Sequence, residues 1–113
     1  MKYDLVILGA GAAGLMAAIT ASLRNRSVLV IERSNKVGKK ILMSGGGRCN
    51  FTNTDLEFDN FLSKNKHFCK SALSRYTAWD FIDLVKQHGI DFEERKHNQL
   101  FCVHSAKDIV KML

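Results

Sequence analysis

The stretch that decides the fold is YDLVILGAGAAG, which runs from Tyr3 to Gly14. Its first half, Tyr3–Leu8, is rich in leucine and β-branched residues, which predicts a short strand buried on both faces. The alanine- and leucine-rich residues 15–24 predict a helix. Ser27–Glu32 has the composition of a second buried strand. The order strand, glycine turn, helix, strand predicts a right-handed βαβ unit.

The glycines of this stretch have the G-x-G-x-x-G spacing of a dinucleotide-binding turn. Gly9 allows the tight turn, Gly11 lets a pyrophosphate approach the backbone, and Gly14 lets the helix pack closely on the strand. The helix N-terminus offers free N–H groups to the phosphates. Glu32 follows Gly14 by eighteen residues, where a carboxylate accepts hydrogen bonds from a ribose. The alternative is a glycine-rich turn that serves packing alone.

The distribution of charge supports an anionic ligand. The formal net charge is +6, and residues 24–48 hold seven cations against the single anion Glu32. A ligand with phosphates fits this excess, although a solvated basic loop is the simpler explanation for any one lysine. A nucleic-acid interface needs exposed aromatic residues among the basic ones. Residues 24–48 contain no aromatic residue, so we expect a small-molecule substrate and no nucleic-acid partner.

Length and cysteine content indicate a single domain in a reducing compartment. The chain has 113 residues and three cysteines, an odd number that favours a cytoplasmic setting over a disulfide framework. Cys49 and Cys69 do not form a C-x-x-C motif, which argues against a dithiol relay. No metal-ligand spacing is present, so we expect no metal. The uncharged run 5–23 resembles a signal peptide or membrane helix, but its glycines favour the βαβ unit, and we expect no membrane association.

A second motif, SGGGRCNFTN, runs from Ser44 to Asn53. Three consecutive glycines disfavour helix and strand, so we expect a polar loop. Its backbone N–H groups can face an anion or the edge of a flavin. Arg48 supplies a fixed cation, and Asn50 and Asn53 can pair with flavin carbonyls or brace the loop. The sequence therefore predicts a second backbone cradle for a cofactor.

The segment Val37–Asn53, together with GAGAAG and the ER pair at Glu32 and Arg33, resembles a family of bacterial flavoproteins. These are NAD(P)/FAD-dependent oxidoreductases, or aminoacetone-oxidase-like FAD-binding enzymes. The resemblance covers the whole chain, more loosely after residue 88. It implies an α/β fold, a Rossmann-like FAD-binding domain of the two-dinucleotide-binding-domain flavoprotein type. It also implies non-covalent FAD, with NAD(P)H as a candidate electron donor.

The resemblance also implies which residues hold the cofactor. The glycine turn holds the pyrophosphate, Glu32 the ribose, and Arg33 lies beside the adenosine, while the later residues line the rest of FAD. The full set is Gly9, Gly11, Ala12, Ala13, Gly14, Glu32, Arg33, Lys40, Ser44, Gly45, Gly46, Gly47, Arg48, Cys49 and Asn50. An NAD(H)-binding dehydrogenase domain and a regulatory dinucleotide-binding module without turnover stay open as alternatives. The sequence identifies no catalytic residue and no oligomeric state.

The second half of the chain predicts helices and one hairpin. Residues 65–76 and 78–89 are expected to be helical, with a Thr77–Asp80 capping box and a stop at Gly89. Residues 90–96 and 99–103 predict an antiparallel hairpin, and Ser105 is expected to cap a last helix. The expected core is Phe68, Leu73, Trp79, Phe81, Leu84 and Val85; the expected solvated acids are Asp55, Glu57 and Asp59. Because the last helix has an unfinished apolar face, we expect residues 1–113 to be the N-terminal part of a longer flavoprotein.

Overall fold

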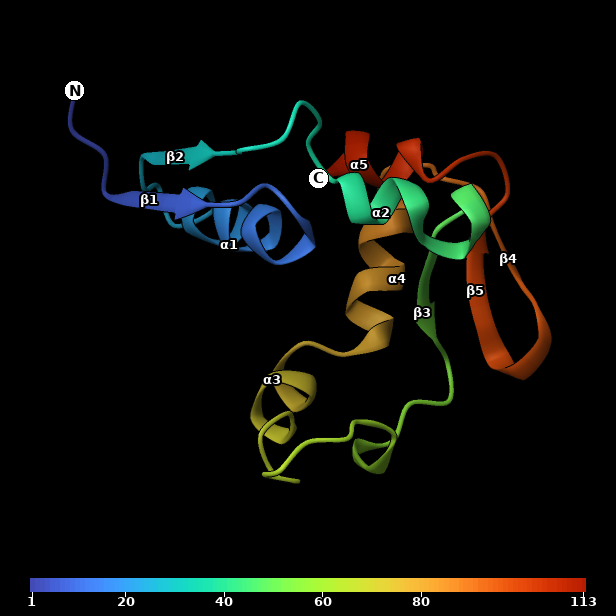
Figure 1. Cartoon of the computed structure of the whole chain (residues 1–113). Helices are drawn as coiled ribbons and strands as arrows, with labels where there is room; N and C mark the ends of the chain where they lie inside the picture. The colour runs from blue at the N-terminus through green and yellow to red at the C-terminus, as the bar shows by residue number, and fades with distance from the viewer.

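The computed structural model describes all 113 residues as five α-helices, five strands in two separate sheets, and three short 3-10 turns. Figure 1 shows the N-terminal strands and helix on one side and the remaining elements on the other. The two groups are joined at Gly38, which is buried with a φ of +66°. Its N–H donates to the carbonyl of Ala10 at 2.8 Å. A Cβ at Gly38 would lie 2.8 Å from Val110, so only glycine fits this junction.

The N-terminal group is the predicted βαβ unit. Strand β1 (Leu5–Leu8) pairs in parallel with β2 (Val28–Ile31), and helix α1 (Ala12–Ser22) connects them. The helix begins at Ala12, three residues earlier than the sequence predicted, because Gly11 takes the N-cap position and the alanines after it favour helix. No residue of α1 is buried, and several apolar residues of the two strands are exposed: Leu5, Val6, Leu8 and Ile31. The unit therefore leaves much of its apolar surface uncovered.

The second sheet is antiparallel and has the strand order β3-β5-β4. Strands β4 (Phe92–Glu94) and β5 (Gln99–Cys102) form the predicted hairpin. Strand β3 (Asn50–Asn53) pairs with the other edge of β5. The prediction of a loop over Ser44–Asn53 is therefore wrong for its second half. Tertiary pairing overrides the local preference here, because β5 supplies hydrogen-bond partners from far along the chain.

The remaining elements are short except for α4. They are α2 (Lys39–Met43), η1 (Ser44–Gly47), η2 (Phe58–Asn60), α3 (Lys70–Arg75), α4 (Ala78–Gln87), η3 (Lys96–Asn98) and α5 (Lys107–Met112). The capping box of α4 is confirmed, since the Asp80 N–H donates to the Thr77 hydroxyl and the Thr77 N–H donates to the Asp80 carboxylate. Gly89 ends the helix with a φ of +65°. Helix α3 is shorter than predicted, and the Ser105 hydroxyl accepts from the Lys107 N–H at the start of α5.

The core lies in the second group of elements. The buried cluster consists of Ile41, Cys49, Val85, Cys102, Ala106 and Ile109. Val85 was expected there, but Phe68 and Trp79 are 79% and 59% exposed, so the prediction that they are core residues is wrong. Phe68 precedes α3, and Trp79 lies in the first turn of α4, at the end away from the cluster (Figure 1). The expected acids Asp55, Glu57 and Asp59 are exposed. No helix of the structure has the length and apolar character needed to span a membrane.

Candidate dinucleotide-binding site

The glycines of the turn between β1 and α1 differ in their surroundings, since one is closely packed and another faces open space. A Cβ at Gly14 would lie 2.0 Å from the carbonyl oxygen of Gly9, so the helix could not pack against the turn with any other residue. Gly9 has a φ of +106°, which favours glycine on conformational grounds. Gly11 has an ordinary backbone conformation, and no atom lies within 4 Å of its Cβ position. Nothing within the chain requires glycine at position 11, whereas a ligand that approaches the backbone would.

Glu32 fastens this turn to the end of β2. One carboxylate oxygen accepts from the Ala10 N–H at 2.7 Å, and the other accepts from the Ser34 N–H at 2.8 Å. These backbone hydrogen bonds, that from Ser34 first and that from Ala10 second, lower the pKa of Glu32 below its ordinary value. Each carboxylate oxygen has a further lone pair. Glu32 therefore stays ionised beside the turn and keeps acceptor capacity for a hydroxyl group, while Arg33 next to it is exposed.

The three consecutive glycines do not all serve one purpose. Gly45, Gly46 and Gly47 have φ values of +55°, +62° and +89°, all in the left-handed region. A Cβ at Gly45 would lie 2.5 Å from the Asn50 nitrogen and 2.9 Å from the Phe101 ring, so Gly45 is required for packing. No atom lies within 4 Å of the Cβ positions of Gly46 and Gly47. These two glycines leave an open stretch of backbone.

Polar side chains tie the same segment to β5 and its neighbours. The Arg48 guanidinium donates to the carbonyl of Val103. The Asn50 amide, in the orientation that satisfies its hydrogen bonds, donates to the carbonyls of Leu100 and Thr52, both at 3.1 Å. Asn53 donates to the carbonyl of His97 at 2.8 Å. Of the two roles that the sequence left open for the asparagines, the structure contains the bracing one.

Backbone hydrogen bonds hold the segment just as firmly. The Ala106 N–H donates to the carbonyl of Gly47 at 2.8 Å, and the Cys102 N–H donates to that of Arg48 at 2.9 Å. The start of α5 and the end of β5 therefore fix the position of the glycines. Hydrogen bonds therefore tie the segment to the second sheet and to the start of α5, whereas the sequence predicted only a polar loop.

A cavity of about 280 Å³ joins the start of α1 to this segment. Five of the predicted cofactor-binding residues line it: Ala12, Lys40, Ser44, Cys49 and Asn50. The other lining residues are Met16, Ile41, Phe51, Phe81, Ile109 and Leu113. The remaining predicted residues, including Glu32 and Arg48, lie outside this lining. Sequence reasoning missed the apolar members, because an apolar side chain in a cofactor cavity has the same pattern as one in a core.

Cys49 lines the cavity as a neutral thiol. Burial raises its pKa, and its φ of +53° is unusual for a residue with a side chain. The next cysteine in the sequence is Cys69, but the neighbour of Cys49 in the structure is Cys102 on β5, whose N–H lies 3.4 Å from the Cys49 carbonyl oxygen. Burial also raises the pKa of Cys102, to about 11. Both thiols are therefore protonated at neutral pH.

Comparison with known proteins identifies a family with a Rossmann domain. The family described as "HI0933-like protein Rossmann domain" matches residues 3–113. The chain is 56% identical over 112 residues to the ribosomal RNA dihydrouridine synthase of Escherichia coli, covering 99% of this chain and 28% of that protein. The protein of the same name from Haemophilus influenzae is 53% identical over 108 residues, covering 96% and 27%.

A more distant relative carries a different name. The 3-dehydro-bile acid delta(4,6)-reductase of Clostridium scindens is 30% identical over 91 residues, covering 79% of this chain and 22% of that protein. The chain thus spans between 22% and 28% of the length of these three curated relatives. The expected resemblance to Rossmann-type oxidoreductases is confirmed, but the two relatives with more than half of their aligned residues identical carry the dihydrouridine synthase name rather than that of an aminoacetone oxidase.

Proposed function

The chain belongs to the HI0933-like family with a Rossmann domain, and from this premise we propose that it forms the ADP- and pyrophosphate-binding part of an FAD site. The observation that carries the proposal is the cavity that unites Ala12 at the start of α1 with Lys40 and the Ser44–Asn50 segment. Two motifs that lie thirty residues apart in the sequence contribute to one space. At about 280 Å³ this cavity is small for a whole dinucleotide, so it would accommodate part of the cofactor.

The geometry of the two glycine segments fits a pyrophosphate. The Cβ positions of Gly11, Gly46 and Gly47 have no neighbours within 4 Å, so side chains there would fill the space that a ligand needs. Helix α1 has no side-chain cap and no acidic residue in its first turn. Its first N–H groups lack intrahelical acceptors and carry the positive end of the helix dipole. They are therefore available to phosphate oxygens.

The charged residues around the turn suit the rest of an ADP group. Glu32 is ionised and keeps acceptor capacity for ribose hydroxyls. Lys40 lines the cavity and offers a cation to the phosphates. Arg33 is exposed next to Glu32, where it would lie beside the adenosine. These roles extend the expectations from the sequence and remain proposals.

The flavin would supply the two-electron chemistry, and this chain would bind and orient it. Met16, Phe51 and Phe81 line the cavity and make part of its surface apolar. Ser44 and Cys49 line the same space. The Ser44 hydroxyl donates to the carbonyl of Ile41 at 2.7 Å, which orients its oxygen. The Cys49 thiol is neutral, so it does not repel an electron-rich cofactor.

We propose ribosomal RNA as the substrate of the whole protein. Two relatives with more than half of their aligned residues identical to this chain are named ribosomal RNA dihydrouridine synthases. Conversion of uridine to dihydrouridine adds two hydrogen atoms across a carbon–carbon double bond, and the name of the Clostridium scindens relative also describes a reductase. This proposal departs from the expectation of a small-molecule substrate. A base inside folded RNA must leave its stack before an enzyme can act on it.

The test compares cofactor content in two valine variants of the same helix. Gly11→Val fills the open space over the turn, whereas the matched control Ser22→Val places the same side chain at the exposed end of α1. Each substitution is made in the full-length protein, which is purified, and the released cofactor is identified by absorbance and mass. We expect FAD in the wild type and in Ser22→Val and little in Gly11→Val. Equal FAD content in both variants would contradict the assignment, and a nicotinamide dinucleotide in place of FAD would favour the dehydrogenase alternative.

A further inference from the structure

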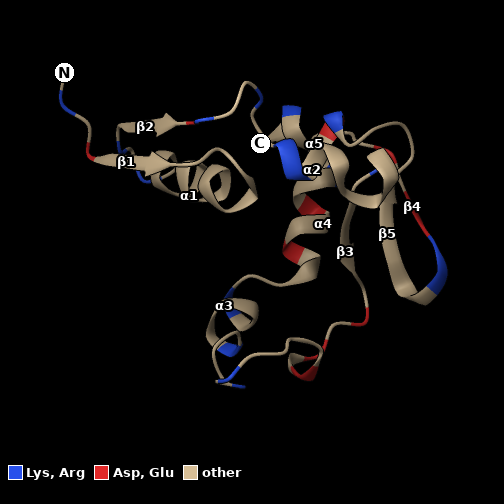
Figure 2. Cartoon of the chain, in the orientation of Figure 1, with Lys and Arg blue, Asp and Glu red and all other residues tan.

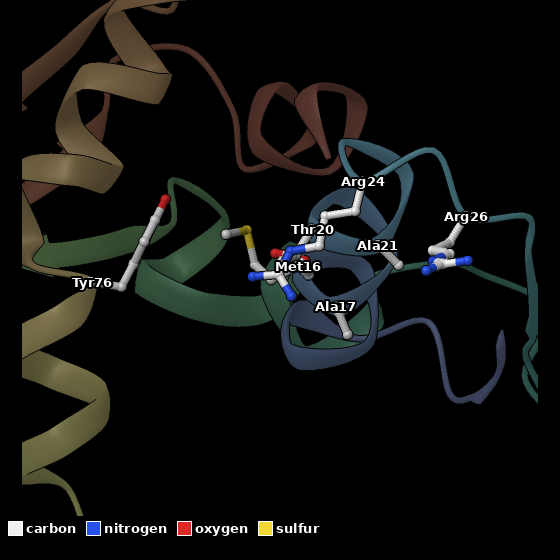
Figure 3. A pocket seen from close by; sticks show the side chains of 7 residues that line it. All are labelled: Met16, Ala17, Thr20, Ala21, Arg24, Arg26 and Tyr76. Atoms are coloured by element: carbon white, nitrogen blue, oxygen red, sulfur yellow. Dashed lines mark hydrogen bonds between the residues drawn. The ribbon is translucent and has the colours of Figure 1, made fainter. Parts of the chain in front are cut away.

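A second and larger groove lies along α1. It has a volume of about 790 Å³ and is lined by Met16, Ala17, Thr20, Ala21, Arg24, Arg26 and Tyr76. Figure 3 shows Tyr76 facing Met16 across the groove, with Arg24 and Arg26 toward the end of the helix. Met16 also lines the dinucleotide cavity, so the two spaces adjoin at this residue. Nothing in the proposed FAD site uses the arginines or the tyrosine.

Both walls of the groove come from segments without any acidic residue. Residues 5–31 contain Arg24 and Arg26 as their only charged side chains. Residues 60–79 contain four cations, Lys64, Lys66, Lys70 and Arg75, and no anion. The remaining eleven cations of the chain are balanced by its eleven acids, so these two segments account for the net charge of +6. Figure 2 shows cations on α3, the helix whose C-cap residue is Tyr76.

We propose that this groove binds single-stranded RNA, with a base stacked on Tyr76 and phosphates paired with Arg24 and Arg26. The proposal rests on the proposed function, because it names the surface on which this chain meets an RNA substrate. A basic groove combined with aromatic stacking platforms is how proteins bind single strands without strict sequence preference. Arginine also pairs with phosphate in a bidentate manner. Ala17 and Ala21 also line the groove, and their small side chains leave room for a base.

The side chains around Tyr76 support this use of its ring. Tyr76 is 42% exposed, and its partial burial raises the pKa of its hydroxyl, so the group is neutral and can donate a hydrogen bond. The nearby acid Asp80 is engaged in the capping box with Thr77. Phe68 and Trp79, on either side of Tyr76 in the sequence, are exposed as well. With Phe61, which is exposed too, four aromatic rings accompany the cations of residues 60–79.

The expectation of no nucleic-acid partner was based on residues 24–48, which contain no aromatic residue. The structure supplies the missing ring from the α3–α4 connection, about fifty residues later in the chain. Arg24, Arg26 and Tyr76 line one groove because of the tertiary fold, and their spacing in the sequence does not predict this. The expectation of no nucleic-acid partner therefore rests on a segment that supplies only part of the groove lining.

The test measures the affinity of the full-length protein for a labelled single-stranded RNA of about 12 nucleotides that contains uridine. Arg24→Gln with Arg26→Gln is expected to weaken binding and to reduce the slope of log affinity against log salt by about 1.4, for two lost phosphate contacts. Tyr76→Leu is expected to weaken binding between about fivefold and a hundredfold, from the loss of one stacked base. The matched control Lys96→Gln with Lys107→Gln removes two exposed cations elsewhere and is expected to leave affinity nearly unchanged.

A second measurement asks whether the groove is open. Nitration of tyrosine, read peptide by peptide, is expected to modify Tyr76 in the free protein and to be slowed there by RNA, with Tyr3 as the internal reference. A Tyr76 that is already shielded without RNA would mean that another part of the protein covers the groove, and it would overturn the proposal. So would groove variants that bind RNA as tightly as the wild type.

The two proposals fail separately. If the groove variants bind RNA normally but FAD is present, the groove assignment falls and the proposed function stands. If the protein contains no FAD while the groove variants lose RNA affinity, the cofactor assignment falls and the groove assignment stands. FAD content of the groove variants is expected to equal that of the wild type, because none of their altered residues lines the dinucleotide cavity.

Discussion

At the scale of single residues, Glu32 is the side chain that ties the glycine turn to the end of β2 and that would hold the ribose in the proposed site. Glu32→Gln keeps the shape of the side chain but removes the charge that two backbone N–H groups bind. We expect weaker FAD binding in Glu32→Gln and a greater loss in Glu32→Ala, measured by titration with FAD. Unchanged affinity in both variants would mean that Glu32 serves the turn alone and has no contact with a ribose.

Glu32 also predicts a dependence of stability on pH. Its pKa in the folded chain is lower than the ordinary value of 4.5, so the folded state favours the ionised form. The stabilising contribution is complete above pH 4.5 and is lost as the pH falls through the lower folded-state pKa. Urea unfolding at several acidic pH values is expected to show a smaller loss of stability in Glu32→Gln than in the wild type. Parallel curves for the two proteins would contradict this account.

The three thiols are expected to differ sharply in reactivity. Cys49 and Cys102 are 5% and 0% exposed and have raised pKa values, whereas Cys69 is partly exposed. A disulfide reagent at neutral pH is expected to modify one thiol quickly and two slowly, and Cys69→Ser is expected to abolish the fast phase. A fast phase that survives in Cys69→Ser would show that the buried pair is accessible.

Because the pKa of Cys102 is raised from 9.0 to about 11, stability is expected to fall as the pH rises between these values.

At the scale of elements, the first and last glycines of the α1 turn act differently from the middle one. Gly14→Ala places a Cβ 2.0 Å from the Gly9 carbonyl oxygen, so helix and strand must move apart. We expect a loss of about 1–3 kcal/mol in the free energy of unfolding. Gly11→Ala meets no atom within 4 Å and is expected to cost less stability but more FAD affinity. Urea unfolding and FAD titration of both variants check this, and equal stability losses would contradict it.

How far each element could be predicted depends on where its stabilising contacts lie. The βαβ unit and the α4 capping box were predictable, because the glycine spacing and the Thr77–Asp80 pair act within one turn of chain. Strand β3 was not, because its hydrogen bonds go to β5. The exposure of Trp79 follows from its place at the outer end of α4 and has no signal in helical periodicity.

The residues of the candidate site could be named from the sequence, but the tertiary contacts that bring them together could not. The family resemblance implied that Ala12, Lys40 and Asn50 face one cofactor, and the structure places them on one cavity. The bracing roles of Arg48 and Asn50 depend on carbonyls of β5 and of the β5–α5 connection, which no local pattern identifies. The same limit explains why Tyr76 was not associated with Arg24.

At the scale of the whole molecule, the exposed apolar surface of the βαβ unit predicts how the chain behaves alone. Leu5, Val6, Leu8 and Ile31 are between 37% and 81% exposed, which is unusual for a sheet of parallel strands. We expect the isolated 113-residue chain to bind a hydrophobic dye and to bind FAD weakly. A protein of the relatives' length that carries this segment is expected to show neither property. A compact two-state melt of the short chain, without dye binding and with tight FAD, would contradict this expectation.

The pairing of β3 with β5 has a consequence for synthesis. Asn50 pairs with Phe101, and a ribosome that adds about 5–20 residues per second needs roughly 3–10 s to make the chain between them. The βαβ unit is complete by Ile31 and can fold while translation continues. The backbone of Gly46 and Gly47 acquires its fixed position only when β5 emerges and Ala106 reaches the carbonyl of Gly47. The nascent chain therefore holds one half of the proposed nucleotide site for several seconds before the other half arrives.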